Sequence, residues 1–131
     1  MRLIITVILL LTIGSKANSQ NQMTLITSKE RVRINLTGSG NAEICWGDGQ
    51  KSKYRRLPSK YNDFNDEIHT YSDSTARTIT IVGNDIRILS CYGNQLTYLD
   101  VSKNNALKIL YCGANQLTNL DLTVKYKLLI N

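Results

Sequence analysis

The feature that most constrains the fold is a 21-residue repeat in the second half of the chain. Residues 86–106 read IRILSCYGNQLTYLDVSKNNA, and residues 107–127 read LKILYCGANQLTNLDLTVKYK. Nine of these 21 aligned positions carry the same residue. Leu128 and Leu129 stand where a third unit would begin, another 21 residues on. A fixed period of this length is typical of solenoid proteins, in which similar units stack on one another.

Within each unit, the residues follow the pattern L-x-x-L-x-C-x-x-N-x-L, continued by x-x-L-D. The alternation around Leu89 and Cys91 predicts a strand with one buried face, and Leu110 and Cys112 are their equivalents. The asparagine of each unit stands where that strand must turn, and its amide is expected to bond backbone groups there. The residues predicted to be structural in this way are Leu89, Cys91, Asn94, Leu96, Leu99, Leu110, Cys112, Asn115, Leu117 and Leu120.

This pattern resembles the leucine-rich repeat in its short form, with cysteine at the third apolar position. The resemblance implies coils that stack into a parallel sheet, with the two asparagines forming a ladder. Stacked units bury their apolar faces only against neighbours, and at least three are normally needed. Residues 86–131 hold two coils and the start of a third, so they are expected to lean on the N-terminal segment. The open edge of the last coil indicates a partner, self-association or a shortened gene product, and the sequence leaves all three open.

The first 19 residues have the pattern of an export signal. Arg2 precedes an uncharged run, Leu3–Ile13, and Ala17-Asn18-Ser19 is a small-x-small cleavage pattern. The run is shorter than the ~20 apolar residues of a membrane helix, and no later segment could span a bilayer. We therefore expect export to the extracellular space, the periplasm or the cell surface. Cleavage removes Arg2 and Lys16, which lowers the formal net charge from +6 to +4.

Residues 20–85 are predicted to form a separate, β-rich segment. Val32, Ile34 and Leu36 alternate with polar residues, as in a half-buried strand, and residues 42–46 and 78–82 form two more strands. Glycine and asparagine predict turns between and after them, at residues 37–41, 47–49 and 83–85.

Three short motifs in this segment carry a second resemblance. WGDG at residues 46–49, HTY at 69–71 and TITI at 78–81 are similar, in this order, to the pattern of PKD-like β-sandwich domains. A PKD-like segment that runs directly into ILSCYGNQLTYLDVS resembles the exported leucine-rich-repeat proteins of Bacteroidetes-type bacteria. The resemblance implies a cap of about five strands, residues 20–85, merging into the solenoid of residues 86–131.

The residues that could support chemistry favour structural roles. Cys45, Cys91 and Cys112 lack the C-x-x-C spacing of zinc sites, and we expect free thiols that pack as small hydrophobes rather than a disulfide. His69, the only histidine, is expected to bond the Trp46–Asp48 turn and not to act as a general base. Since the chain has no nucleophile motif, we expect no enzyme activity, no cofactor and no metal.

Two charged clusters are interpreted as solvent-exposed structure and not as binding sites. Asp63, Asn65, Asp66 and Glu67 could supply oxygen ligands for calcium, but the spacing of an EF-hand is missing and a polar loop is favoured. Four cations between residues 51 and 56 could meet an anionic polymer. A solvated β-hairpin face is the better interpretation, and no nucleic-acid-binding motif accompanies them.

The predicted functional surface is the outward face of the repeat strands. With a period of two, the side chains that point away from the core are Ile88, Ser90, Tyr92, Ile109 and Tyr111. Solenoids supply extended binding surfaces and rarely active sites. The hypothesis is therefore a secreted or cell-surface module that binds a protein or a glycan. The alternative is a truncated, structural or vestigial product with no ligand of its own.

Overall fold

Strands of alternating buried and exposed residues dominate the structure, a computed structural model that describes residues 21–62, 65–118 and 127–129. The strands are β1 (Gln22–Thr27), β2 (Arg31–Cys45), β3 (Lys51–Tyr54), β4 (Glu67–Thr70), β5 (Arg77–Ser90), β6 (Leu96–Asp100), β7 (Ile109–Tyr111) and β8 (Lys127–Leu129). They join in one eight-stranded sheet that is mostly antiparallel. The expectation of a mainly β chain is confirmed. The proposed export signal, residues 1–19, lies outside the described residues.

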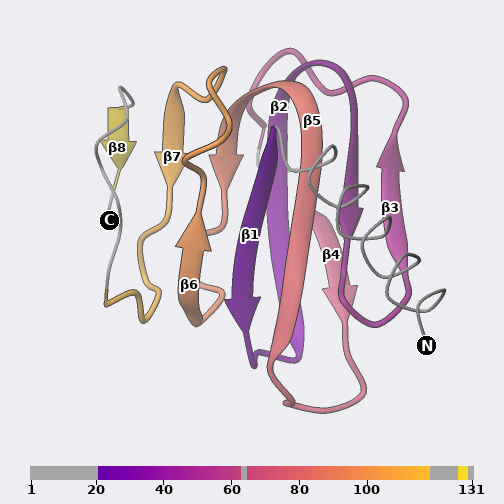
Figure 1. Cartoon of the computed structure of the whole chain (residues 1–131), viewed down its shortest axis with the longest axis vertical. Helices are drawn as coiled ribbons and strands as arrows, with labels where there is room; N and C mark the ends of the chain where they lie inside the picture. Colours follow the sequence, from indigo (N-terminus) through magenta and orange to yellow (C-terminus); the bar gives the residue numbers. More distant parts are fainter. Residues whose placement is uncertain (1–20, 63–64, 119–126, 130–131) are drawn as a thin grey trace, which may run out of the picture.

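Two long strands, β2 and β5, form the centre of the sheet and pair antiparallel along most of their length. The turns predicted at residues 37–41 and 83–85 are therefore wrong, because β2 and β5 run straight through them. The turn at 47–49 is present, between β2 and β3. Figure 1 shows β2 and β5 passing through the middle of the molecule, with β3 at one side and β8 at the other.

The glycines in the mispredicted segments mark irregularities inside a strand pair and not chain reversals. The β2–β5 register shifts between Thr37 and Gly38, and again between Ser39 and Ala42. A Cβ atom on Gly38 would lie 1.9 Å from the carbonyl oxygen of Asp85. Glycine within a strand commonly signals a bulge or a close backbone approach, and both occur here.

The strands on either side complete the sheet along the order β3-β2-β5-β1-β6. β1 was not predicted, although it pairs with both β5 and β6. β4 pairs with the first residues of β2. Only β5–β7 and β7–β8 are parallel among the described strands, and each pair spans three residues. Pairs this short do not make a solenoid, so the repeat architecture stays a prediction.

The parallel strands also correct the predicted start of a third unit. Leu89 pairs with Leu110, 21 residues on, as the repeat implies. Leu110, however, pairs with Leu128, only 18 residues on, whereas the repeat made Leu128 the equivalent of Leu107. When residues 122–127 are aligned with residues 101–106, no position carries the same residue. The identity between the two units therefore ends at Asp121.

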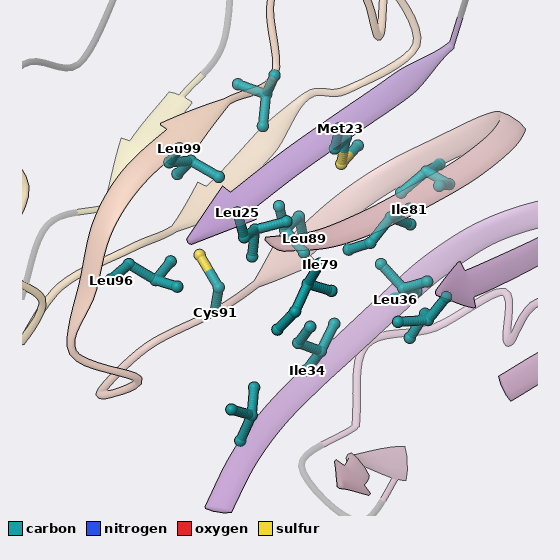
Figure 2. Packing of buried hydrophobic residues seen from close by; sticks show 14 of the residues in the cluster. Met23, Leu25, Ile34, Leu36, Ile79, Ile81, Leu89, Cys91, Leu96 and Leu99 are labelled. Atoms are coloured by element: carbon teal, nitrogen blue, oxygen red, sulfur yellow. The ribbon is translucent and has the colours of Figure 1, made fainter. Parts of the chain in front are cut away.

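A single core joins the two segments that the sequence separated at residues 85–86. β5 crosses this boundary without interruption. Figure 2 shows Met23 and Ile34 from the first segment packed in one cluster with Leu89 and Leu96 from the second. All four side chains are completely buried. The N-terminal strands therefore cover the apolar face of the repeat residues, which would otherwise be exposed.

The cationic run at residues 51–56 lies on a hairpin, as expected. Lys51 and Lys53 are on β3, and their Nζ atoms lie 3.0 and 3.7 Å from the carboxylate oxygens of Glu43 on β2. Ion pairs this exposed contribute little to stability. In the described part of the chain, no helix is long and apolar enough to cross a membrane.

Candidate functional site

A groove of about 650 Å³ opens where the start of β2 meets the ends of β5 and β7. The residues that line it are Lys29, Arg31, Arg33, Tyr61, Asp66, Ser90, Tyr92, Gly93, Asn94 and Tyr111. Strand pairing brings these distant segments together. Asn35 of β2 pairs antiparallel with Ser90, the last residue of β5, so the residues before Asn35 run alongside those that follow Ser90. Ser90 also pairs in parallel with Tyr111.

Three of the five residues predicted on the outward face line this groove. Ser90 and Tyr111 are half-buried, and the Tyr92 side chain is 55% exposed. Ile88 and Ile109 pair with each other but do not line the groove, and both are half-buried. The predicted surface is therefore divided: Ser90, Tyr92 and Tyr111 line the groove, whereas Ile88 and Ile109 lie outside it.

Two asparagine amides, of Asn94 and Asn115, bond backbone groups at and beside the groove. The Asn94 side chain accepts a hydrogen bond from the Arg33 N–H at 2.9 Å and donates to the Arg33 carbonyl at 2.6 Å. Asn115 Oδ1 accepts from the N–H groups of Asn94 and Leu96, at 3.0 and 2.9 Å. Both amides thus satisfy backbone groups that no strand partner reaches, which is the role that the sequence suggested.

The remaining repeat residues lie where their apolar character requires. The side chains of Leu89, Cys91, Leu96, Leu99, Leu110 and Cys112 are buried. Leu117 is half-buried against the same core, and Leu120 lies outside the described residues.

Among the described residues that line the groove, three are cations and one is a carboxylate. The Arg33 Nε lies 3.4 Å from Asp66 Oδ2. Lys29 Nζ donates to the Gly93 carbonyl oxygen at 2.6 Å, which occupies one of its three protons. The Arg31 side chain makes no ion pair or side-chain hydrogen bond within the described residues. Among the described residues, its guanidinium therefore has no anionic partner.

Aromatic rings form the other main part of the lining. The rings of Tyr61 and Tyr111 lie 5.2 Å apart between centroids, at an interplanar angle of 31°. Tyr92, in the turn that follows β5, adds a third ring. Together the groove offers flat apolar rings, hydroxyl groups and cations. This set can hold a ligand, but it contains no nucleophile paired with a base.

Comparisons with known protein families, with curated proteins and with solved structures found no match.

Sequence reasoning missed Lys29, Arg31, Arg33 and Tyr61 as groove residues. A partial signal was present, because Arg31 and Arg33 alternate with the buried Val32 and therefore point outward from β2. Nothing local indicated that this face of β2 lies beside Tyr92. That proximity follows from pairing between strands more than 50 residues apart in the chain.

His69 has a structural position, as predicted. Its Nε2 lies 2.7 Å from Asp48 Oδ2, and its ring stacks on Trp46 at 4.7 Å and 10°. Tyr71 meets the His69 ring edge-on and donates from its hydroxyl to the Trp46 carbonyl at 2.6 Å. Burial raises the pKa of Tyr71 to about 12, so this hydroxyl remains a donor at neutral pH. The cluster fastens the turn after β2 to β4.

The Asp48–His69 contact is expected to make the stability of the fold depend on pH. Partial burial would raise the pKa of Asp48, but hydrogen bonds from His69 and from the Gln50 N–H outweigh it and lower the pKa below its usual value. A carboxyl group with a lowered folded-state pKa stabilises the fold above its unfolded-state pKa, and this contribution disappears as the pH falls through the folded value. We expect Asp48→Asn to be less stable than the parent at pH 7, with the difference closing below about pH 4. Urea unfolding of both proteins between pH 2 and 7 measures this, and a gap independent of pH would contradict it.

The other residues considered for metal binding or catalysis, the cysteines and the acidic cluster, are buried or make internal contacts. All three cysteines are free, and burial raises the pKa of the Cys91 and Cys112 thiols, which keeps them protonated. In the acidic cluster, Asp66 Oδ1 accepts from the Asn35 amide at 2.9 Å, and Glu67 accepts from the Ser52 hydroxyl at 2.7 Å. Asp63 lies outside the described residues. Across residues 21–62, 65–118 and 127–129, no group of three or more acidic, histidine or cysteine side chains could hold a metal ion.

Proposed function

We propose that this chain is an exported, non-catalytic binding module that holds a protein or glycan ligand in the groove between β2, β5 and β7. In this proposal, residues 20–85 are a PKD-like cap and residues 86–131 are leucine-rich-repeat coils that merge with it. Two observations support the repeat part of the proposal. Leu89 and Leu110 pair in parallel 21 residues apart, and the equivalent Asn94 and Asn115 amides both bond backbone groups.

The observation that carries the proposal is the composition of the groove. Tyrosine and arginine are enriched at binding surfaces, because they offer large contact areas together with polar groups. Here Tyr92, Tyr111 and Arg31 lie on three different segments that all face one opening. Tyr92 keeps more than half of its surface exposed. An aromatic ring held in this way is available for a ligand.

Removing the groove rings is expected to abolish binding. We expect the double variant Tyr92→Ala/Tyr111→Ala to lose affinity by roughly tenfold or more for ligands captured by the parent from envelope and host-surface proteins and from an array of glycans. Because Tyr92 is exposed and Tyr111 only half-buried, the melting temperature should change little.

A matched control is Tyr98→Ala. Tyr98 is 46% exposed on β6 and does not line the groove. Binding should be retained in this variant. Equal binding by the parent and the double variant would exclude the groove as the ligand site.

A further inference from the structure

We infer that the ligand of this groove is a peptide segment of a partner protein, and that its aromatic side chain takes the place of Tyr61 beside Tyr111. The inference rests on the proposed function and names the ligand class and the regulation of the same site. It depends on one juxtaposition in the fold. Residues 57–62, called the strap below, connect β3 to β4 and place a tyrosine ring against the predicted binding face.

The strap already holds an aromatic ring at the site. Tyr61 and Tyr111 both line the groove, and Tyr111 belongs to the face that the sequence predicted to contact a ligand. The centroids of the two rings lie 5.2 Å apart, at an interplanar angle of 31°. Aromatic side chains attract each other when their centroids are about 4.5–7 Å apart. The position beside Tyr111 therefore accommodates an aromatic ring, and the chain fills it from within.

The strap also meets β2 through its backbone, as a bound peptide would. The Gly38 N–H donates to the Pro58 carbonyl oxygen at 2.9 Å, and the Leu57 N–H donates to the Gly40 carbonyl oxygen at 2.8 Å. Both bonds lie on the stretch of β2 between the parts that pair with β3 and with β4. Extended peptides bind to sheets in this manner, with affinity from backbone hydrogen bonds and specificity from side-chain contacts.

A buried amide of β2 adds a third backbone contact. Asn35 is 2% exposed and pairs with Ser90, a residue of the groove. Its Nδ2 donates to the Asn62 carbonyl oxygen at 2.8 Å and to Asp66 Oδ1 at 2.9 Å. The site thus binds an aromatic ring and, one residue further along, a peptide carbonyl. A peptide with an aromatic residue supplies both groups at neighbouring positions, as the strap does, whereas a chain of glucose units supplies neither.

In this arrangement the strap is an internal competitor of the ligand. A site that is open in only a fraction of the molecules binds its ligand more weakly by that fraction. Tyr61 is 37% exposed and Leu57 only 3%, so the ring can be displaced while the strap stays anchored in the core. Tyr92, 55% exposed in the same groove, offers the partner a first contact before the exchange.

The test is an NMR titration of the isotope-labelled full chain with three probes. These are the end-blocked peptide PSKYN, which copies residues 58–62, the same peptide with alanine in place of tyrosine, and a maltooligosaccharide. We expect Tyr61→Ala to bind the tyrosine peptide about tenfold more tightly than the parent, because the competing ring, present at high effective concentration, is gone. The amide signals of Ser90 and Tyr111 should shift. The alanine peptide should bind at least about tenfold more weakly, since it lacks the aromatic contact.

The matched control is Tyr98→Ala, which removes an exposed tyrosine outside the groove. This variant should bind the tyrosine peptide like the parent. An equal gain in Tyr98→Ala and Tyr61→Ala would show that the gain does not come from the strap and would overturn the inference. A thermal melt of each variant separates a change in binding from a loss of fold.

The remaining outcomes distinguish the two proposals. The inference is wrong if Tyr61→Ala binds the tyrosine peptide no more tightly than the parent, if the gain persists in Tyr61→Ala/Tyr111→Ala, or if no probe binds. If the maltooligosaccharide binds in a Tyr111-dependent manner and the peptide does not, the inference is wrong and the binding module stands. The proposed function is decided separately by the capture experiment with Tyr92→Ala/Tyr111→Ala.

Discussion

Gly38→Ala is expected to destabilise the protein by about 3 kcal/mol or more, a large part of the total stability of a domain of this size. The added Cβ would lie 1.9 Å from the Asp85 carbonyl oxygen and 3.2 Å from the Arg87 backbone nitrogen. Both are backbone atoms of β5, so no side chain can rotate to make room. The two strands would have to separate at the centre of the sheet, where Gly38 pairs with Ile86.

Urea unfolding of the parent and of two variants measures this effect. The control is Gly40→Ala, two residues along the same strand. Its Cβ would meet no atom within 4 Å, although its φ of 73° disfavours side chains and should cost about 1–2 kcal/mol. If Gly38→Ala were no more destabilising than Gly40→Ala, the close approach of β2 to β5 at this bulge would be contradicted.

Asn115→Ala is expected to destabilise the protein by about 3 kcal/mol. Its Oδ1 accepts two backbone N–H groups, from Asn94 and Leu96. Its Nδ2 lies within hydrogen-bond distance of the carbonyl oxygens of Cys91, Cys112 and Gly113, at 3.0 to 3.2 Å. Alanine leaves these backbone groups without the partner. A buried polar group left unpaired destabilises a protein by about 1–3 kcal/mol, and the solvent near this half-buried site reduces the sum.

Hydrogen exchange localises this effect. In Asn115→Ala, the amides of Asn94 and Leu96 should lose protection before the core strands do. The neighbouring Gln116 has an exposed side chain, and Gln116→Ala should change the unfolding free energy by less than about 0.5 kcal/mol. Unchanged protection of the Asn94 and Leu96 amides in Asn115→Ala would contradict the bonding described above.

The two damaging positions differ in how visible they are in the sequence. Asn115 is recognisable because it recurs as Asn94 at a fixed spacing, next to buried strand residues. Gly38 led to the wrong prediction of a turn, because it stands in a cluster of small and polar residues, Thr37–Asn41, that usually indicates one. Local composition cannot distinguish a chain reversal from a bulge, since the difference depends on whether a partner strand continues alongside.

The sequence by itself determined the β class, the equivalence of Leu89 with Leu110, the bonding role of the two asparagines and the structural position of His69. Each follows from local spacing, which fixes the face a side chain takes and the groups within its reach. Only the tertiary structure decided that β5 runs through residues 85–86 and that Arg31 lies near Tyr92. Both depend on antiparallel pairing between segments far apart in the chain, where many pairings satisfy the same local pattern. Burial of one shared core selects among them, and that selection creates the cationic groove.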